Sequence, residues 1–395
     1  MKRYMDIATV GPLRECIERK YRELFGAEPL LVRAPGRINL IGEHTDYNGG
    51  LVLPAAINKQ IVLAVGKRDD FAIQLYAQDQ QQSYGVHMGE LAKSTMLWPD
   101  YVLGVVQQLL QQGCRLTGFN LVFGGDIPQG AGLSSSAALE CATAFALNEL
   151  FGLGMSRLDL ARIAQAAENE FVGVKCGLMD QFASMFGREQ QLIKLDCSDF
   201  SYEYIPFNSH DLRIVLFDTR VKHSLASSAY NERREQCEQG VALVQRHHPE
   251  VKSLRDVTRQ QLETYVKPVD ETVYGRCRYV VSEIARLRDG CDDLKKGDFL
   301  SFGRKMFETH EGLKHLYEVS CDELDILVGL VADDDAVLGA RMMGGGFGGC
   351  TINLVKADQV QRVADAVTAA YSKKTGQSAL VYVADISAGT DVITD

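Results

Sequence analysis

The segment of this 395-residue chain with the most chemical content is Gly130 to Glu140, which reads Gly-Ala-Gly-Leu-Ser-Ser-Ser-Ala-Ala-Leu-Glu. Glycines that let the backbone approach an anion are followed by three hydroxyl residues and then by strong helix formers. The preceding residues, Phe119 to Phe123, read as a strand. A glycine-rich loop between a strand and a helix suits phosphate, because free N–H groups and the helix dipole attract negative charge. The segment therefore predicts a binding site for a nucleotide or another phosphoryl compound.

Two widespread phosphate-binding motifs do not fit this loop. A Walker A loop has a lysine after its second glycine, and here Ala131 follows Gly130. A dinucleotide fingerprint needs a third glycine at the place of Ser135. Neither the H-R-D nor the D-F-G sequence of protein kinases occurs. The alternative left open is an ordinary strand-to-helix turn in which a serine caps the helix.

Polar side chains are dense in a second glycine-bearing segment, residues 33–50. They are Arg37, Asn39, Glu43, His44, Asp46 and Asn48. Carboxylates accept hydrogen bonds from sugar hydroxyls, and His and Asn side chains can donate as well as accept. The segment predicts a polyhydroxy ligand, and the alternative is a surface loop in which Asp and Asn form turns.

A glutamate near the end of an expected helix, Glu168, precedes a glycine turn that ends in Asp180. An aspartate on such a turn can act as a base, and a glutamate at a helix end can bind magnesium. The alternatives are that Glu168 lies on a solvated helix face and that Asp180 is an ordinary N-cap.

The third glycine-rich segment, residues 342–350, contains the formal dinucleotide pattern Gly344-x-Gly346-x-x-Gly349. A strand follows it, whereas that motif requires a helix. We expect instead a tight glycine turn that packs against a substrate or another loop.

Hydrophobic periodicity predicts a mixture of helices and strands around these segments. The expected helices cover residues 11–26 (with Leu13, Ile17, Tyr21 and Leu24 on one face), 101–112, 135–151, 157–172, 226–248, 273–288, 298–318 and 358–374. The expected strands cover residues 30–33, 61–65, 119–123, 193–196, 213–218, 351–355 and 379–384. In the helix at 226–248 we expect Glu232 to Glu235 to form a solvated face. A connection near 205–212 divides the chain into predicted domains 1–207 and 208–395, and the second ends in a βαβ-like unit.

Composition limits the classes of partner. The chain carries 42 basic and 52 acidic residues, a net charge of −10, which argues against nucleic-acid and anionic-membrane binding. Its ten cysteines include no C-x-x-C pair, so we expect neither a zinc site nor a disulfide framework. The N-terminus lacks the apolar run of a signal peptide, and no segment is apolar enough to span a bilayer. We expect a cytoplasmic protein.

Taken in order, the glycine-bearing segments resemble those of the GHMP small-molecule kinases. Pro128 to Ala137 looks like the ATP loop shared by that family. Gly36 to Tyr47, Cys176 to Gln181 and Ser228 to Arg234 are similar to segments of its galactokinase branch. The resemblance covers nearly the whole chain. It implies a two-domain α+β fold with a ribosomal-S5-like N-terminal domain, a ferredoxin-like C-terminal domain and an active site between them.

The resemblance also implies an activity, the ATP- and Mg²⁺-dependent phosphorylation of the C1 hydroxyl of galactose at the start of galactose catabolism. Asp180 would be the catalytic base, and Arg37 beside it would stabilise charge on the reacting oxygens. The implied sugar contacts are Arg37, Glu43, His44, Asp46, Gly177, Asp180 and Tyr230. The implied ATP contacts are Gly130, Ala131, Gly132, Leu133, Ser134, Ser135 and Ser136. Ser136 and Glu168 would hold Mg²⁺, and we expect a monomer or a weak oligomer.

One residue departs from the family pattern, because Met343 stands where the third motif usually has threonine. Two further alternatives stay open at this point. The substrate could be N-acetylgalactosamine or another galactose-like sugar, or the chain could be a non-enzymatic sensor of sugar and ATP. Sensors of this kind lack a Ser-Ala pair in the ATP loop, whereas residues 134–138 are intact here. A dinucleotide-dependent dehydrogenase is disfavoured by the missing third glycine.

Overall fold

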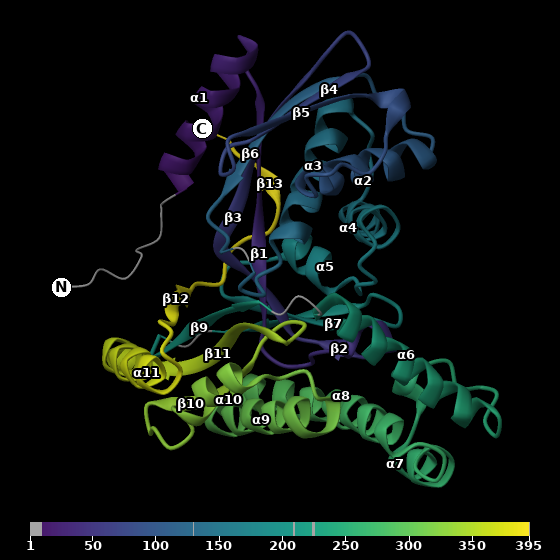
Figure 1. Cartoon of the computed structure of the whole chain (residues 1–395), viewed down its shortest axis with the longest axis vertical. Helices are drawn as coiled ribbons and strands as arrows, with labels where there is room; N and C mark the ends of the chain where they lie inside the picture. Colours follow the sequence, from purple (N-terminus) through teal and green to yellow (C-terminus); the bar gives the residue numbers. More distant parts are fainter. Residues whose placement is uncertain (1–9, 129, 208–209, 223–225, 395) are drawn as a thin grey trace.

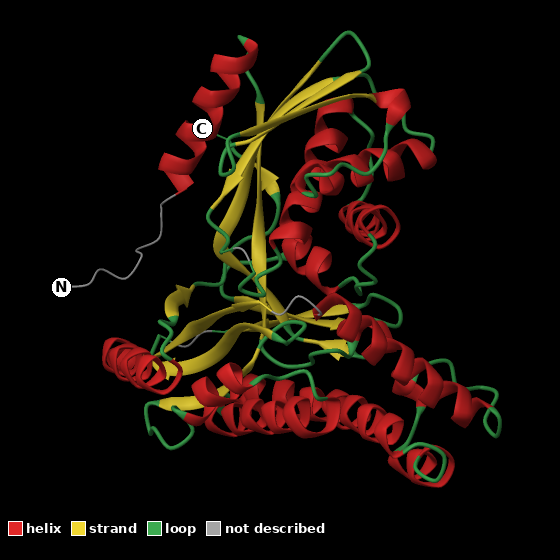
Figure 2. Cartoon of the chain, in the orientation of Figure 1, coloured by secondary structure: helices red, strands yellow, loops and turns green. Residues whose placement is uncertain are grey.

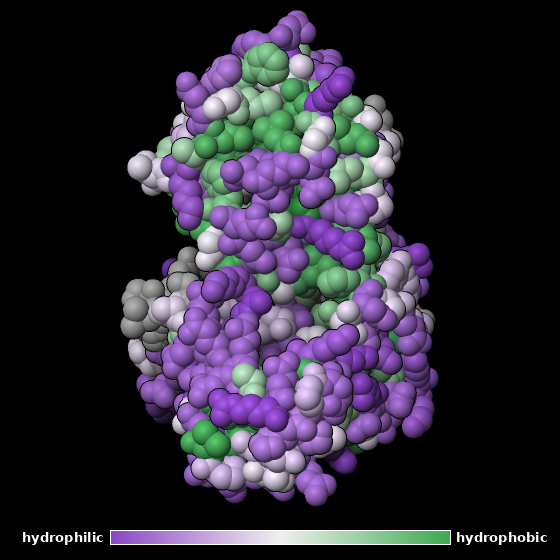
Figure 3. All heavy atoms as spheres, turned by 90° about the vertical axis from the view of Figure 1, so that its right-hand side faces the viewer, coloured by the Kyte–Doolittle hydropathy of each residue, from purple (hydrophilic) through white to green (hydrophobic). Residues whose placement is uncertain are grey.

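The computed structural model describes residues 10–128, 130–207, 210–222 and 226–394. They form two large sheets with helices packed on them, one above the other in Figure 1, and a small sheet between the two. Figure 2 shows the upper sheet between one helix on one side and several helices on the other, whereas long helices line the base of the lower half. On the face seen in Figure 3, hydrophobic residues gather over the upper part and the lower part is mostly hydrophilic.

The upper sheet has the strand order β13-β1-β3-β6-β4-β5, and its pairs are antiparallel except for β4 with β6. Its strands are β1 (Leu30–Asn39), β3 (Pro54–Lys67), β4 (Ala72–Ala77), β5 (Gln82–His87), β6 (Phe119–Gly125) and β13 (Asp391–Val392). The helices of this half are α1 (Val10–Phe25), α2 (Trp98–Gln111), α3 (Ser135–Phe151), α4 (Arg157–Ala166) and α5 (Met179–Phe186).

Both faces of the upper sheet are covered by helices. From α1, Ile17 and Tyr21 pack with Val62 and Val122 on one face, while α3 and α5 contact β1 and β3 on the other. A strand buried on both faces has a continuous apolar sequence rather than an alternating one, which explains the run from Ile61 to Val65.

The lower sheet is antiparallel, with the order β10-β11-β9-β12. Its strands are β9 (Leu212–Lys222), β10 (Val337–Met342), β11 (Gly348–Lys356) and β12 (Leu380–Ala384). The principal helices of this half are α6 (Ala226–Gln245), α8 (Glu271–Lys296), α9 (Phe299–Gly312), α10 (Asp322–Gly329) and α11 (Val360–Thr375). Tyr371 and Val367 of α11 pack on Phe217 of β9, and Gly376 ends α11 with a φ of 73°. The predicted βαβ-like unit is therefore confirmed as β11, α11 and β12.

Shorter elements join the two halves. The small sheet consists of β2 (Leu51–Val52), β7 (Gln191–Asp196) and β8 (Tyr202–Pro206). Its order is β2-β7-β8, and one hydrophobic core runs continuously from the upper half into the lower half. The last strand, β13, returns to the upper sheet and pairs Val392 with Val32 of β1. The division of the chain at residue 207 stays a prediction, and β13 lies beyond it on the upper sheet.

The predicted elements are present, with two local errors. Leu24, expected on the buried face of α1, is 41% exposed. Arg233, expected on a solvated face of α6, is 8% exposed, and its guanidinium donates to the carbonyls of Tyr317 (2.7 Å) and Glu318 (3.0 Å). Charge runs predict solvent exposure only on average, and here unpaired carbonyls at a helix end offer the buried arginine its partners.

Candidate active site

The predicted phosphate loop lies between β6 and α3 and has unusual backbone angles. Gly130 and Gly132 have φ values of 78° and 74°, and Ser134 is left-handed at 59°. The Ser134 side chain does not cap α3, because its Oγ donates to the carboxylate of Asp180. The alternative of a simple serine-capped turn is therefore wrong for Ser134. The first N–H groups of α3 receive no acceptor from this serine, and such groups suit a phosphate.

Asp180 lies in the first turn of α5, and its carboxylate forms a two-point ion pair with Arg37 of β1. The distances are 2.8 Å from Nε to Oδ1 and 3.0 Å from Nη2 to Oδ2. Arg37 also donates to the carbonyl of Gly132, which ties the pair to the phosphate loop. The N-cap of α5 is Leu178, so the N-cap alternative for Asp180 is wrong. Burial alone lowers the pKa of Arg37, but the charges of Asp180 and Glu43 outweigh it and raise that pKa.

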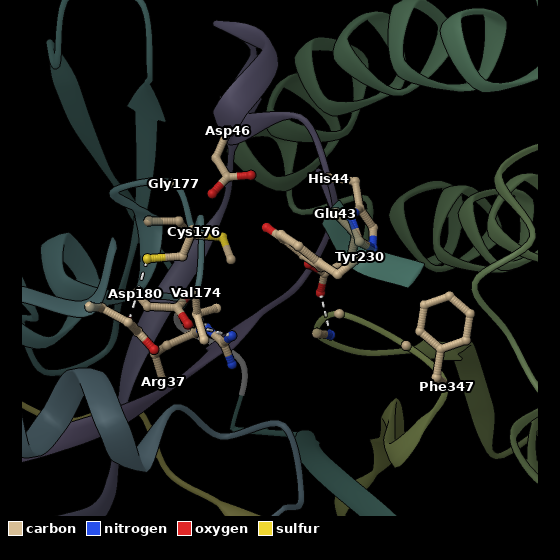
Figure 4. Close-up of a pocket in the computed structure, with 15 residues that line it drawn as sticks. Arg37, Glu43, His44, Asp46, Val174, Cys176, Gly177, Asp180, Tyr230 and Phe347 are labelled. Atoms are coloured by element: carbon tan, nitrogen blue, oxygen red, sulfur yellow. Dashed lines mark hydrogen bonds and ion pairs between the residues drawn. The ribbon is translucent and has the colours of Figure 1, made fainter. Parts of the chain in front are cut away.

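A pocket beside this ion pair collects every residue that was expected to contact sugar (Figure 4). Its lining includes Arg37, Glu43, His44, Asp46, Gly177, Asp180 and Tyr230. They come from β1, the 3₁₀ helix η1 (Asp46–Asn48) and the residues before it, the turn before α5, and α6. Gly177 has a steric reason to be glycine, because a Cβ there would collide with the Asp46 carboxylate. The structure thus brings together side chains that are up to 193 positions apart in the sequence.

Burial sets the charge state of two side chains in this pocket. Burial is the main cause that lowers the pKa of His44 to about 4, so its imidazole is neutral near pH 7. Burial first, and then the charge of Asp180, raises the pKa of Asp46 to about 7. The pocket therefore contains a neutral imidazole beside a carboxyl group that titrates near neutral pH.

Glu43 joins the pocket to the third glycine-rich segment. Its Oε1 accepts hydrogen bonds from Nη2 of the fully buried Arg341 at 3.0 Å and from the backbone N–H of Gly344 at 2.8 Å. In the same segment, a Cβ on Gly349 would lie 3.5 Å from the backbone of Ala131 in the phosphate loop. The expectation of a tight turn packed against another loop is confirmed.

Met343, the departure from the family pattern, is buried within this third segment. Its backbone N–H donates to the carbonyl of Cys350 at 3.0 Å, and its side chain is 1% exposed. Its neighbours Gly344 to Phe347 line the pocket beside Asp180, and Met343 does not. The substitution therefore adds bulk behind the glycine turn.

Ser136 and Glu168 lie side by side at the start of α3. Ser136 Oγ donates to Glu168 Oε1 at 3.0 Å, and Glu168 Oε2 accepts from Nε2 of Gln181 at 2.8 Å. Glu168 is 8% exposed and belongs to a π-helical turn, Ala167–Val172. The alternative of a solvated helix face for Glu168 is therefore wrong. Within the described residues there is no cluster of three or more His, Cys, Asp or Glu side chains that could hold a metal.

A second pocket, which was not predicted from the sequence, borders the same loop. Its lining is Ile61, Ala77, Asp79, Gln80, Met96, Leu97, Trp98, Tyr101, Phe123, Gly125, Ile127, Ser135, Ser136 and Leu139. Most of these side chains are apolar or aromatic, and two belong to the predicted ATP loop. The available signal was the sole tryptophan of the chain, Trp98, three residues before Tyr101. A pocket with apolar and aromatic walls next to a phosphate loop suits a nucleobase.

Family profiles match three parts of the chain. Residues 19–67 match the galactokinase galactose-binding signature. Residues 100–188 match the N-terminal domain of GHMP kinases, and residues 292–373 match the C-terminal domain. The first two matches contain residues 33–50 and the predicted phosphate loop, and the third contains the glycine turn at residues 342–350.

Curated relatives match over almost their whole length. A galactokinase of Roseiflexus sp. (strain RS-1) is 39% identical over 386 residues, which are 98% of this chain and 97% of the relative. A galactokinase of Thermotoga maritima is 40% identical over 362 residues, 92% of this chain and 99% of the relative.

Solved structures show the same relationship. The crystal structure of Lactococcus lactis galactokinase complexed with galactose has a TM-score of 0.92 at 36% identity, covering 96% of this chain and 99% of that one. A mevalonate kinase shares the fold with a TM-score of 0.63 at 19% identity, covering 90% of this chain and 99% of that one.

The two-domain α+β fold and the loop between β6 and α3 define the class, that of the GHMP small-molecule kinases. The match at 39% identity over nearly the full length identifies the branch within this class: the chain belongs to the galactokinase family. The expected fold class and the resemblance stated from the sequence are both confirmed.

Proposed function

We propose that this chain is an ATP-dependent galactokinase that phosphorylates the C1 hydroxyl of galactose. The observation that carries the proposal is the position of Asp180. Its carboxylate lines the sugar pocket, pairs with Arg37 and accepts from Ser134 of the phosphate loop. A base at this junction can reach a sugar hydroxyl and face the phosphate that the hydroxyl attacks.

In this proposal Asp180 accepts the proton of the C1 hydroxyl while that oxygen attacks the γ-phosphorus and ADP leaves. Arg37 holds the Asp180 carboxylate in a fixed orientation and stabilises charge on the reacting oxygens. Glu43, His44, Asp46, Gly177 and Tyr230 would form the walls of the sugar site. Phosphoryl transfer depends mainly on alignment and charge neutralisation, and these residues supply both.

ATP is the proposed co-substrate, with its phosphates on residues 130–136 and its base in the pocket of Trp98 and Tyr101. Mg²⁺ is proposed to bind at Ser136 and Glu168. Their oxygens are 3.0 Å apart, and magnesium prefers one or two protein oxygens together with substrate phosphates. The ion would neutralise charge between the β- and γ-phosphates.

We also propose a cytoplasmic protein that acts as a monomer or weak oligomer, without nucleic-acid or membrane partners. All ten cysteines are free, as expected in a reducing compartment. The net charge of −10 disfavours polyanionic partners. Among the described helices, none is long and apolar enough to cross a membrane.

The test is ADP release with Mg-ATP across galactose, glucose, N-acetylgalactosamine, mevalonate and homoserine. We expect turnover with galactose, reduced about 100-fold or more in Asp180→Asn, the usual effect of losing a positioned base. Binding of ATP and galactose to Asp180→Asn, measured by calorimetry, should stay within a few-fold of wild type.

The other outcomes separate the alternatives. Turnover with N-acetylgalactosamine in place of galactose would keep the mechanism and change the substrate. Binding of galactose and ATP without any turnover would favour a sensor over an enzyme. Near-wild-type turnover in Asp180→Asn would reject Asp180 as the base.

A further inference from the structure

The imidazole of His44 is held on several sides by tyrosine rings. Its ring centroid lies 5.9 Å from that of Tyr47, 5.3 Å from that of Tyr230 and 4.9 Å from that of Tyr317. His44 is 4% exposed, and its backbone is left-handed with a φ of 62°. Packing of this kind fixes the plane of the ring, and the remaining variable is which ring nitrogen carries the proton.

A chain of hydrogen bonds leads from this ring into the lower half of the molecule. His44 Nδ1 lies 2.7 Å from Tyr47 Oη, which lies 2.8 Å from Tyr317 Oη. Tyr317 Oη in turn lies 3.3 Å from Sγ of Cys237 on α6. Each of these hydroxyls has one proton to donate, so the direction of one bond in the chain determines the direction of the others.

The thiol at the far end of the chain favours one direction. A thiol can donate its proton, but its sulfur is a weak acceptor. Burial raises the pKa of both tyrosines, so both hydroxyls keep their protons. If Cys237 donates to Tyr317, then Tyr317 donates to Tyr47 and Tyr47 donates to Nδ1. The imidazole proton is then on Nε2, a buried atom that makes no hydrogen bond of standard geometry with the described residues, although the backbone of Gly345 lies close enough to raise the pKa of the ring.

We propose that Tyr47, backed by Tyr317, is a positioning residue that fixes His44 as an Nε2–H donor to one ring hydroxyl of the sugar. This proposal rests on the proposed galactose site. A hydroxyl that accepts from Nε2–H still has its own proton to donate, and Asp46 lies two residues away in the same pocket as an acceptor. A sugar lacking that hydroxyl would leave the buried Nε2–H unpaired and would be disfavoured.

The first test reads the tautomer directly. In protein labelled with ¹⁵N-histidine, the protonated and unprotonated imidazole nitrogens have well separated shifts. We expect the wild-type chain, without any sugar, to carry the His44 proton on Nε2 and Tyr47→Phe to show a mixture of tautomers. A wild-type His44 that carries its proton on Nδ1 would overturn the proposal whatever the activity.

The second test measures sugar affinity in Tyr47→Phe and Tyr317→Phe. We expect the galactose Kd of Tyr47→Phe to rise about fivefold, as for the loss of one hydrogen bond, with kcat changed less than threefold. Tyr317→Phe should have a smaller effect of the same sign. The matched control is Tyr371→Phe, which removes another buried hydroxyl, bonded to the Thr219 carbonyl at 3.2 Å, and should leave Kd unchanged.

Deoxygalactoses distinguish positioning from general damage to the pocket. For the one deoxy sugar that lacks the recognised hydroxyl, Tyr47→Phe should bind as well as wild type, because the lost contact is already absent. An equal loss of affinity for galactose and for every deoxy sugar would overturn the proposal. Absence of phosphoryl transfer to galactose in the wild type would reject the proposed function instead. The tautomer of His44 could still be determined, because that measurement does not depend on activity. If Tyr47→Phe does not fold, the wild-type tautomer and Tyr317→Phe decide the question.

Discussion

Two carboxyl groups face the sugar pocket from different elements, Asp46 from η1 and Asp180 from α5. They have different partners. Asp180 is paired with Arg37, whereas burial and the charge of Asp180 raise the pKa of Asp46 to about 7. A pair of acids in unlike surroundings can divide two tasks, one accepting a proton and the other accepting hydrogen bonds from the substrate. If the pocket binds sugar as proposed, the charge state of Asp46 sets how well the free protein binds it.

This difference predicts a pH dependence for the capture of galactose. Asp46 is an acid with a raised pKa, so it is neutral below pH 7 and becomes an acceptor-only carboxylate above it. We expect kcat/KM for galactose to rise with pH and to reach half its maximum near pH 7, because kcat/KM reports the free enzyme. Steady-state rates measured between about pH 5.5 and 8.5 would show whether kcat/KM follows the titration of a single group. Asp46→Asn should lack this rise of kcat/KM with pH. A wild-type kcat/KM that does not change with pH would contradict the role given to Asp46.

At the scale of elements, the site depends on helix ends that are not regular. The helix from Arg157 continues as a π-helical turn, Ala167–Val172, which ends at Gly173 with a φ of 100°. That turn carries Glu168 toward the start of α3, where it meets Ser136. Single π turns are rare and recur at functional sites, because the extra residue changes where the side chains point. Here it brings a carboxylate to a loop that is 32 residues earlier in the sequence.

The π turn leads to a prediction about magnesium. Glu168→Gln replaces a carboxylate oxygen with an amide and should raise the Mg²⁺ concentration needed for half-maximal activity by about tenfold or more, since even the loss of a residue that only supports a metal ligand typically costs about tenfold. The control is Glu170→Gln, whose side chain in the same turn accepts from Gln108 at 2.8 Å. Titrating Mg²⁺ at fixed ATP gives both values. The same requirement in both variants would count against Glu168 as a ligand.

At the scale of the whole molecule, the two halves are joined by more than one crossing of the chain. After β12 the backbone returns to the upper sheet, where Gly389 N–H donates to the Gly187 carbonyl and Thr390 N–H to the Ser184 carbonyl, at 2.9 and 2.8 Å. These partners flank the end of α5, the helix that carries Asp180. The returning segment therefore supports the helix of the proposed base at the end opposite to Asp180.

We predict that ending the chain after Ser387 lowers the thermal midpoint by roughly 5–10 °C, because several buried hydrogen bonds and the pairing of β13 with β1 are lost. Turnover should fall at temperatures well below that midpoint, since α5 loses its support. A chain that ends after Ile393 keeps β13 and serves as the control. Calorimetric scans of both truncations would test this, and identical midpoints would show that β13 contributes nothing.

Local sequence patterns predicted the elements well and their environments less well. Residues 135–151 form a helix with the expected bounds, because a glycine loop and a run of helix formers specify both its start and its course. Solvent exposure was predicted for Arg233 and was an alternative for Glu168. Both are buried, and no local pattern indicates the distant carbonyls, amides and hydroxyls that pair with them. The strand expected at 30–33 extends to Asn39 and so includes Arg37, because pairing with β3 outweighs the turn tendency of Pro35 and Gly36.

The candidate site was likewise predicted only in part from the sequence. The residues proposed for the sugar site were named together because a family resemblance supplied long-range information that spacing alone lacks, and the structure places them around one pocket. The apolar pocket around Trp98 was missed, since its walls come from separate strands and helices without a shared motif. Their proximity follows from how the upper sheet packs on α2 and α3.

The contact between the third glycine turn and the phosphate loop limits how such a pocket can be redesigned. Gly344 stands close to the backbone of Gly132, and Gly349 close to that of Ala131, with backbone on both sides. A Cβ on either glycine would make only ordinary contact with the phosphate loop, but both glycines have left-handed φ values, 84° and 82°, so any larger residue would strain the turn that adjoins that loop. We therefore expect a change in this turn that is meant to alter sugar preference to alter the handling of ATP as well. Val174, Cys176 and Tyr230 contribute side chains to the same pocket from other elements. Libraries for new sugar acceptors should therefore vary these three positions and leave the glycine turn unchanged.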